Sequence, residues 1–314
     1  MLLKPFVSAV LMAVAALVPL SVRAQAPTAA RSERPGPRGI AGRLTWFDRR
    51  GKIVGTVGET GIYRTLALSP DGKRVAVERT DPATQNKDIW VFDVATNTGI
   101  RLTSDPAWDA FPIWSPDGAR IVFMSNRSGV YDLYEKAASG AGTDKLFYRS
   151  TEGKGVTSWS PDGKFLLYYS IGQPTHVRLL AADGPADREA VPLVDPRFAS
   201  VSARFSPDGR WIAYSSNESG KNEISIRTFE SATGTAGAPV IATKGGGRGP
   251  LWRGDGKELF YIAADGTAMA MKFKSTGSTF QVGAPKPLFK IPAGLLFWDV
   301  SPDGKRFLMP APEH

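Results

Sequence analysis

The chain has 314 residues, of which 42% are hydrophobic, and its formal net charge is +9. It contains no cysteine, which excludes a disulfide framework, a thiolate nucleophile and a cysteine-based metal site. The positive charge favours an anionic surface or partner, but the basic residues are scattered along the chain, so we expect no nucleic acid partner.

The first 24 residues differ in composition from the rest of the chain. Lys4 precedes an apolar run over residues 6–20, and small residues follow up to Ala24. This arrangement predicts a secretory signal peptide over residues 1–24, with an uncleaved membrane anchor as the alternative. We therefore expect a periplasmic or secreted protein that has no transmembrane span after cleavage. Residues 25–41 are rich in Ala, Pro, Arg and Gly without periodicity, which predicts a flexible leader.

A four-residue motif, Ser-Pro-Asp-Gly, recurs along the remainder of the chain. The copies start 45 to 48 residues apart, which indicates one structural unit repeated six times. A repeat array buries its apolar faces between neighbouring units, so we predict a single repeat domain over residues 42–314. Five copies start at a serine and one degenerate copy starts at an arginine: Ser69, Ser115, Ser160, Ser206, Arg253 and Ser301.

The motif has the chemistry of a tight hairpin turn. Proline presets φ for the second turn position, aspartate hydrogen-bonds forward to backbone N–H groups, and glycine accepts a positive φ. We predict that the motif is structural, because six identical carboxylates have no catalytic purpose. The predicted turn residues are Pro70, Asp71, Gly72, Pro116, Asp117, Gly118, Pro161, Asp162, Gly163, Pro207, Asp208, Gly209, Asp255, Gly256, Pro302, Asp303 and Gly304.

A full unit contains four short segments with β-strand character. In the first unit these are residues 63–68, 74–78, 88–92 and 100–103, which predict an antiparallel meander. The second segment of every unit is apolar on both faces, as is typical of a strand between two sheets. One large apolar side chain precedes each turn, and we expect these side chains to pack between units: Leu68, Trp114, Trp159, Phe205, Trp252 and Val300.

The two ends of the repeat region complement each other. The sixth unit has only its first two strands, and residues 43–48 and 53–57 have the character of a third and a fourth strand. A closed circle removes the unpaired edges that a linear array would leave. The sequence therefore predicts an all-β fold, a six-bladed β-propeller of four-stranded antiparallel blades in which N-terminal strands complete the last blade.

The repeat resembles a known family. Its turn, together with a third strand such as residues 89–93, Ile-Trp-Val-Phe-Asp, is similar to the WD40-like propeller repeats of the TolB type. The resemblance covers residues 43–310 and implies an exported propeller that binds a protein or peptide in the bacterial cell envelope. TolB proteins also carry an N-terminal α/β domain, for which the residues between the predicted signal and the first strand are too few. The repeat also looks like the extracytoplasmic propellers of some bacterial membrane serine/threonine kinases, although no kinase sequence is present.

Few residues could perform catalysis. The only histidines are His176 and His314, and the sequence has no Gly-x-Ser-x-Gly or His-Glu-x-x-His motif. We therefore predict no catalytic residues, no enzyme activity and no cofactor. The alternatives are a propeller enzyme of the lactonase or lyase type, and a calcium site near the axis at Asp109 and Asp299.

The connections opposite the turns vary between units, and recognition commonly evolves on such loops. Aromatic and guanidinium groups dominate interface energies. We therefore predict that the protein is a non-enzymatic scaffold for an envelope protein or peptide, with a sensory or structural remnant of a larger receptor as a further alternative. The candidate partner-binding residues are Trp108, Asp109, Arg149, Arg197, Phe198 and Arg248.

Overall fold

The computed structural model describes residues 39–292, 294, 295 and 297–313. Within these residues the chain forms strands and turns and contains no helix, and all strand pairs are antiparallel. The prediction of an all-β chain built from antiparallel sheets is confirmed. The predicted signal peptide, and the predicted leader up to residue 38, lie outside the described residues.

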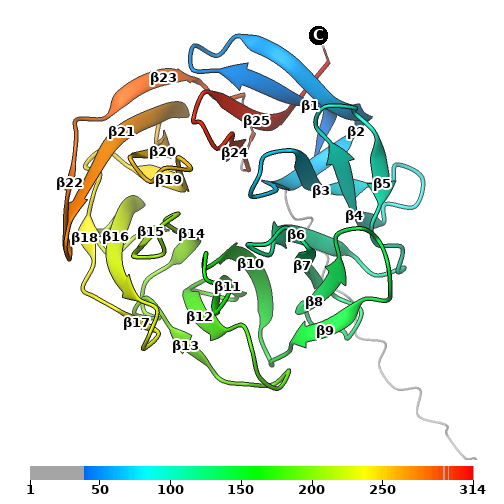
Figure 1. The fold of residues 1–314 in the computed structure, drawn as a ribbon, viewed down its shortest axis with the longest axis horizontal. Helices are drawn as coiled ribbons and strands as arrows, with labels where there is room; N and C mark the ends of the chain where they lie inside the picture. Colours follow the sequence, from blue (N-terminus) through cyan, green and yellow to red (C-terminus); the bar gives the residue numbers. More distant parts are fainter. Residues whose placement is uncertain (1–38, 293, 296, 314) are drawn as a thin grey trace, which may run out of the picture. The chain divides into compact units, whose positions relative to one another are not determined.

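Strands from both ends of the chain share one sheet. β1 pairs with β25, with Trp46 opposite Leu308, in a seven-stranded sheet of order β24-β25-β1-β2-β3-β4-β5 (Figure 1). β2 continues for 16 residues, so its first part pairs with β1 and its last part with β3. This continuous strand differs from the two separate strands that the sequence predicts. The strands are β1 (Ile40–Asp48), β2 (Ile53–Leu68), β3 (Arg74–Thr80), β4 (Lys87–Asp93), β5 (Gly99–Arg101), β24 (Asp299–Val300) and β25 (Arg306–Ala311).

The middle of the chain forms two four-stranded sheets. Each is a meander whose first strand runs into a Ser-Pro-Asp-Gly turn, and the first strands lie innermost in the ring of sheets (Figure 1). The first sheet contains β6 (Asp109–Trp114), β7 (Arg120–Ser125), β8 (Asp132–Ala137) and β9 (Lys145–Tyr148). The second contains β10 (Gly153–Trp159), β11 (Phe165–Ile171), β12 (Val177–Ala181) and β13 (Ala190–Pro192).

The next two units have five strands each rather than the predicted four. Their third strands, β16 and β21, are long enough to pair with a hairpin partner at one end and with an outer strand at the other. One sheet contains β14 (Ser200–Phe205), β15 (Trp211–Ser216), β16 (Glu223–Glu230), β17 (Thr235–Ala236) and β18 (Val240–Ile241). The other contains β19 (Gly247–Trp252), β20 (Glu258–Ala263), β21 (Thr267–Thr276), β22 (Thr279–Val282) and β23 (Lys286–Lys290).

The five Ser-Pro-Asp-Gly turns close through one repeated set of hydrogen bonds. At the first turn, the Ser69 hydroxyl donates to Asp71 at 2.6 Å and accepts from the backbone N–H of Arg74 at 2.9 Å. Asp71 also accepts from the backbone N–H of Lys73 at 3.0 Å. Gly72 has a φ of +69°, which an L side chain adopts only with strain, and the glycines of the other five turns have φ between +68° and +79°. The fifth turn, Arg253-Gly254-Asp255-Gly256, reaches the same glycine φ without the serine and the proline, so aspartate and glycine are the residue types common to all six turns.

The core lies between consecutive units rather than within them. Six clusters of buried apolar side chains are present in the described residues, and each combines residues of two neighbouring units. The large side chain before each turn contributes to one cluster, as predicted. Trp114 adds a bond across the interface, because its indole nitrogen donates to the backbone oxygen of Ala67 at 2.9 Å. Burying such a side chain contributes roughly 1.5 to 3 kcal/mol of stability.

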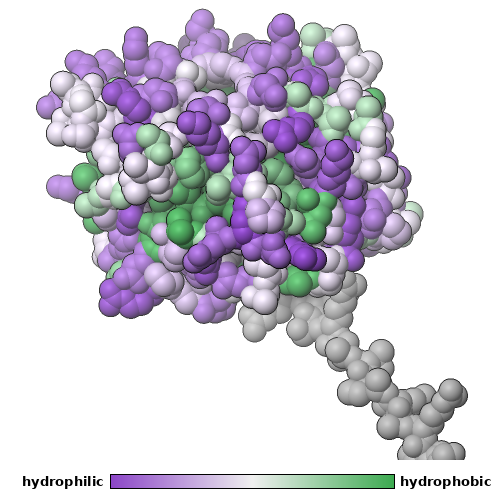
Figure 2. Space-filling model, turned by 60° about the horizontal axis from the view of Figure 1, so that its bottom comes forward, coloured by the Kyte–Doolittle hydropathy of each residue, from purple (hydrophilic) through white to green (hydrophobic). Residues whose placement is uncertain are grey.

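Several large apolar side chains are exposed on the outer strands. Ile100 lies on β5, Val191 on β13, and Val240 and Ile241 on β18. On the face in view in Figure 2, apolar side chains lie near the middle and are divided by hydrophilic groups. Short outer strands with neighbouring polar groups limit edge-to-edge association.

Candidate functional site

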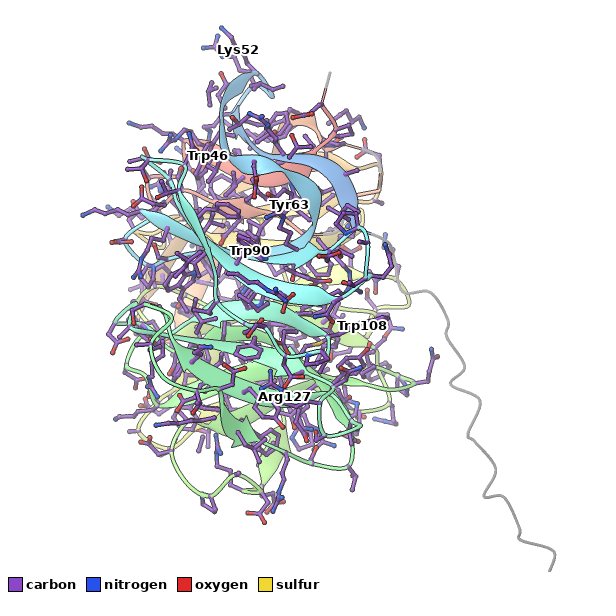
Figure 3. The ribbon with its side chains drawn as sticks, turned by 90° about the vertical axis from the view of Figure 1, so that its right-hand side faces the viewer. Trp46, Lys52, Tyr63, Trp90, Trp108 and Arg127 are labelled. Carbon is purple, nitrogen blue, oxygen red and sulfur yellow. The ribbon has the colours of Figure 1, made fainter. Side chains whose placement is uncertain are left out.

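The face that carries the candidate binding residues lies at the ends of the inner strands remote from the turns. β6 starts at Asp109 and runs to the turn at Ser115, so Trp108 lies at the end far from that turn. In the side view, Trp108 and Trp46 lie toward opposite sides of the molecule (Figure 3). Trp46 stacks with Arg306, which follows the last turn. We call the side that carries Trp108 the loop face and the other side the turn face.

Trp108 is a partly exposed aromatic residue on the loop face. Its backbone N–H donates to the Asn126 side chain at 2.8 Å, which fixes the loop against the next hairpin. The Lys87 ammonium lies 4.4 Å from the centre of its ring. This cation–π contact presents an indole and a positive charge together.

Asp109 is buried, which corrects the expectation that it belongs to an exposed binding face. Its side chain is 0% exposed, and Arg127 contacts both carboxylate oxygens at 3.1 Å. Burial raises the pKa of Asp109 to about 6, against hydrogen bonding from Ser125 and the charge of Arg127. Asp109 therefore anchors Arg127 beneath the loop face.

Arg149, Arg197 and Phe198 lie on connections between successive units, whereas Arg248 lies at the start of β19. Arg149 has a 60% exposed side chain at 4.0 Å from Asp187, so its ion pair is weak. Arg197 is 79% exposed and pairs with Asp195 at 2.6 Å, which holds the pKa of Asp195 at about 2. Its guanidinium lies 5.7 Å from the Phe198 ring.

Arg248 is half-buried, and both of its terminal nitrogens donate to the backbone oxygen of Leu295, at 3.4 and 3.5 Å. Of the six candidates, the structure brings together only sequence neighbours, Trp108 with Asp109 and Arg197 with Phe198. Arg248 thus contacts the connection between β23 and β24. Among the residues described, no hydrogen bond, ion pair or ring contact joins the connections that carry Trp108, Arg149 and Arg197 to one another.

A cluster that the sequence did not predict joins residues of four units, the first three and the last, on or next to their first and second strands. Arg64 of β2 lies 5.2 Å from the Phe111 ring and 5.5 Å from the Phe297 ring, and the two rings meet edge to face at 5.3 Å. Tyr169 packs on Phe111 at 5.8 Å, and Glu78 lies 3.6 Å from the Arg64 guanidinium. We call these five residues the central cluster.

Phe111 holds an unusual backbone conformation within this cluster. Its φ is +53°, a region that bulky residues rarely enter, and it lies at a register shift between Ala110 and Ile113. Its backbone N–H donates to the Thr65 hydroxyl at 3.1 Å. Local strain of this kind often marks functional positions. The sequence carries no signal for it, because the bulge depends on pairing with β7.

A second charged pair lies near the turn face. Asp299 accepts hydrogen bonds from the backbone N–H groups of Leu68 and Val300, each at 2.8 Å. Burial raises the pKa of Asp299, and the nearby positive charge of Arg204 opposes that rise. Arg204 donates to the backbone oxygen of Thr157. The carboxylate is thus engaged in holding inner strands together.

His176 is the one histidine in the described part of the chain. Its Nδ1 lies 3.1 Å from the Ser170 hydroxyl, and its Nε2 is buried without a hydrogen-bond partner among the described residues. The side chain is nearly buried rather than on the solvent side. The described residues contain no group of three or more His, Asp or Glu placed to hold a metal ion. No helix there has the length and apolar character to cross a membrane.

Two family models match the chain. Residues 49–191 match the TolB β-propeller domain, and residues 195–277 match the N-terminal β-propeller domain of prolyl oligopeptidase.

Among curated proteins, the uncharacterized peptidase YuxL of Bacillus subtilis is 27% identical over 189 residues, which cover 48% of this chain and 28% of that protein. The Tol-Pal system protein TolB of Francisella tularensis is 25% identical over 194 residues, or 61% of this chain and 44% of that protein. The chain therefore spans less than half the length of these relatives.

Solved structures share the fold. One assigned to TolB, from Agrobacterium tumefaciens, has a TM-score of 0.61 and 18% identity over 87% of this chain and 98% of that chain. The periplasmic gluconolactonase of Pseudomonas aeruginosa has a TM-score of 0.51 and 15% identity over 78% of this chain and 76% of that chain. At these identities the likeness shows a β-propeller fold. Together with the TolB domain match and the TolB relatives, it makes the chain a TolB-like β-propeller protein.

Proposed function

We propose that the protein is an exported, non-enzymatic binding module of the bacterial cell envelope that engages a protein or peptide through its loop face. The observation that carries the proposal is the set of guanidinium and aromatic groups at this face. Arg149 and Arg197 are exposed, Trp108 is partly exposed, and the central cluster ties Arg64 to two phenylalanines. Residues of these types dominate interface energies when they are held on a rigid scaffold. The match to the Tol-Pal system protein TolB supports an envelope role.

We further propose that the scaffold is a six-bladed propeller over residues 42–314, closed by β1 on β25. In this proposal the seven-stranded sheet divides into two blades at the middle of β2. The last blade consists of β24, β25, β1 and the start of β2. The first blade consists of the rest of β2 with β3, β4 and β5. Six interface clusters support this division, because one of them joins the last unit to the first. A closed ring would hold the loop-face residues at fixed separations, which recognition of one partner requires.

A quantitative capture experiment tests the binding role. The mature chain, immobilised and exposed to envelope extract, should enrich one protein reproducibly. Arg197→Glu and Trp108→Ala should each reduce that enrichment by about tenfold, the loss expected for a residue near a hot spot. Lys52→Glu is a matched control, because it also reverses an exposed positive charge, and Lys52 lies far from Trp108 (Figure 3). Equal enrichment by all variants would count against the loop face as the binding surface.

A hydrolase is the second candidate function, and one observation favours it. Ser170 and His176 lie at hydrogen-bond distance, as a nucleophile and its base would. Turnover of lactone or ester substrates that is abolished by His176→Ala, and also by Ser170→Ala, would establish this function. Unchanged turnover in both variants would exclude the pair.

A further inference from the structure

Strands β1 and β2 are joined by a hairpin whose tip projects from the ring of sheets. In the side view, Lys52 lies beyond the ribbons of the neighbouring strands (Figure 3). The Asp48 carboxylate accepts hydrogen bonds from the backbone N–H groups of Arg50 at 2.8 Å and Lys52 at 3.0 Å, which fixes the backbone of the tip. The Arg50 side chain is 93% exposed and lies 4.0 Å from Asp48. Both basic side chains of the tip therefore extend into solvent from a defined backbone.

Two aliphatic side chains follow the basic tip. Ile53 is 43% exposed and Val54 is 46% exposed at the start of β2. Exposed aliphatic side chains are normal where they occur singly, but these two are adjacent to each other and to Lys52. Such a tip can place its apolar part in an interface while the long basic side chains keep their charges in water.

The hairpin lies against the fifth unit, which contains β19 to β23. Arg49 contacts both carboxylate oxygens of Glu258 on β20, at 2.9 and 2.8 Å. The Phe47 ring stacks with the Phe289 ring of β23 at 6.0 Å. Gly51 approaches the same residue so closely that a Cβ at this position would lie 2.7 Å from the Phe289 Cβ. The basic tip is therefore held next to the surface of the fifth unit.

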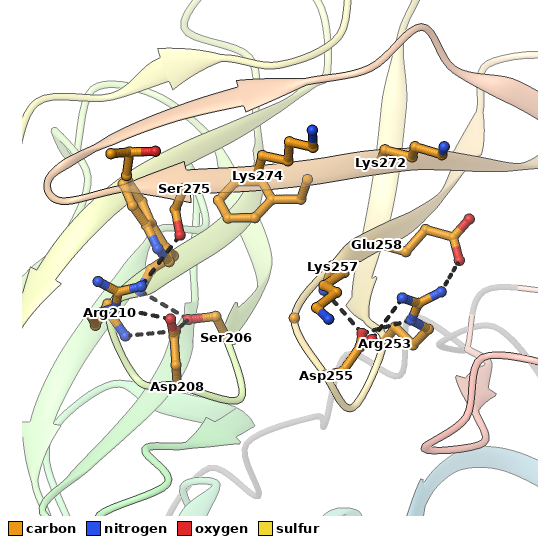
Figure 4. A pocket seen from close by; sticks show the side chains of 14 residues that line it. Ser206, Asp208, Arg210, Arg253, Asp255, Lys257, Glu258, Lys272, Lys274 and Ser275 are labelled. Carbon is orange, nitrogen blue, oxygen red and sulfur yellow. Dashed lines mark hydrogen bonds and ion pairs between the residues drawn. The ribbon is translucent and has the colours of Figure 1, made fainter.

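Three lysines of the fifth unit lie on the face that is directed to the hairpin. Lys272 is opposite Glu258 in the sheet, and Lys274 follows two residues later, so both leave β21 on one face (Figure 4). Lys286 is opposite Ala270, which lies on that same face and belongs to the apolar cluster shared with β25. All three lysines are exposed. Their ammonium groups thus lie on the same side of the unit as the hairpin.

The positive charges of this region are largely unmatched. Lys52 and the three lysines of the fifth unit have no ion pair among the described residues. Glu258 is already neutralised by Arg49 at 2.8 Å and by Arg253 at 3.1 Å. Residues 266–298 contain four lysines and no acidic residue. We call this surface the basic rim, which consists of Arg50, Lys52, Ile53, Val54, Lys272, Lys274 and Lys286.

We propose that the basic rim binds the surface of an anionic lipid bilayer. Clusters of roughly four to eight basic residues bind anionic lipids, and each residue adds about fivefold to the affinity. The basic side chains would contact the headgroups, and Ile53 and Val54 would leave water for the apolar edge of the bilayer. A projecting tip suits a lipid surface, because the strongest contacts of protein interfaces lie in well-packed pockets that exclude water. The basic rim contains none of the candidate partner-binding residues, so the two functions can be tested separately.

Flotation of the mature chain with lipid vesicles tests this proposal. The vesicles contain phosphatidylglycerol and phosphatidylcholine in equal amounts, or phosphatidylcholine alone. We expect binding to the anionic vesicles to be at least about tenfold stronger, and to fall by at least about tenfold between about 0.05 and 0.5 M NaCl, because salt screens the attraction. Equal binding to the two kinds of vesicle would overturn the proposal.

Charge variants locate the contact. Arg50→Ala with Lys52→Ala should weaken binding to the anionic vesicles by at least about tenfold. Neither side chain makes a hydrogen bond among the described residues, so the variant should stay folded. Lys145→Ala with Lys244→Ala is the matched control, because both lysines are exposed, lie outside the basic rim and have no ion pair in the described structure. An equal loss in the two double variants would assign the binding to net charge and overturn the basic rim as its site.

Aliphatic variants separate a bilayer from a soluble polyanion. Ile53→Ser with Val54→Ser should weaken vesicle binding by at least about threefold and leave binding to heparin unchanged, because only a bilayer offers an apolar edge. Val240→Ser with Ile241→Ser is the matched control, since these adjacent side chains are 51% and 48% exposed on β18. Vesicle binding that the first variant leaves unchanged, or an equal loss for vesicles and heparin, would overturn the assignment of a lipid surface.

A third double variant tests the contribution of the fifth unit. Lys272→Ala with Lys274→Ala should also weaken binding to the anionic vesicles by about tenfold or more. Unchanged binding would exclude β21 from the contact and overturn the surface as defined.

Discussion

The carboxylate of Asp299 accepts a hydrogen bond from the backbone N–H of Leu68 at 2.8 Å, between residues that are 231 positions apart. Asp299 begins the last inner strand, and Leu68 ends the first one. The bond therefore links the two ends of the repeat array at the turn face, while β1 on β25 links them within a sheet.

Removal of this carboxylate should loosen the junction. In Asp299→Ala the Leu68 N–H loses its acceptor, and we expect the free energy of unfolding to fall by about 1 to 3 kcal/mol. Asp299→Asn keeps an acceptor oxygen and should lose less. Urea denaturation measures both, with the exposed Asp187→Ala as the control. An alanine variant as stable as the wild type would show that the bond does not stabilise the junction.

Replacing a turn glycine by alanine should reduce the stability of the protein by an amount that depends on the atoms around that glycine. Gly163→Ala adds a Cβ in open space at a φ of +79°, so we expect only the backbone strain of about 1 to 2 kcal/mol. Gly72→Ala should cost more, because its Cβ would lie 2.9 Å from Pro302 as well. Gly245 also has open space but no positive φ, so Gly245→Ala should change stability by less than about 1 kcal/mol. Thermal unfolding of the three variants gives the order, and equal losses at Gly72 and Gly163 would contradict the contact with Pro302.

Asp109 should give the stability of the protein a distinct pH dependence. Its pKa in the folded protein is about 6, above its ordinary value of 3.8. Between these two values the folded state binds more protons than the unfolded state, so this group lowers the free energy of unfolding as the pH rises. Titration followed by carbon NMR should place its midpoint near 6.

The variant Asp109→Asn should lack this contribution to the pH dependence of the free energy of unfolding. Urea denaturation at several pH values between 3.8 and about 6 measures the difference. Arg127, which faces Asp109, remains charged throughout. An unchanged slope in the variant would assign the pH dependence to other groups.

Lys154 and Asp132 form a buried ion pair between neighbouring units. The ammonium is 0% exposed and lies 2.6 Å from Asp132 and 2.6 Å from the backbone oxygen of Glu152. Lys154→Met leaves Asp132 buried and unpaired, and we expect a loss of about 3 to 5 kcal/mol. The double variant Lys154→Met with Asp132→Asn should recover part of the lost stability, because it no longer buries an unpaired charge.

An exposed pair of the same length provides the control for that experiment. Lys290 and Asp265 also lie 2.6 Å apart, but both side chains are about two thirds exposed. Lys290→Met should therefore cost less than about 1 kcal/mol. A similar loss in the two lysine variants, measured by urea denaturation, would contradict the role assigned to burial.

The strands and turns were predictable because they depend on neighbouring residues. Proline, aspartate and glycine at fixed positions select one turn geometry, and alternating apolar residues select strands. The packing position of Trp114 and its equivalents could be predicted for the same reason, since the repeat places them identically. The complementary chain ends also predicted the pairing of β1 with β25.

The sites could not be predicted in this way. The sequence made Asp109 a candidate partner-binding residue, but it is buried beneath Arg127 from the following hairpin. The central cluster combines Arg64, Phe111 and Phe297, which no local pattern connects. The Arg253 turn was interpreted as a degenerate copy, and the ion pairs of Arg253 with Asp255 and Glu258 could not be read from the repeat.

The sequence by itself determined the repeat, the turn geometry and the all-β class, because each depends on interactions over a few residues that recur with one period. Only the tertiary structure decided which charges are paired, which are buried and which remain exposed. The physical reason is that burial and electrostatic pairing depend on distances between side chains from different units. Those distances are set by how the sheets pack and by the insertions at which the repeats differ.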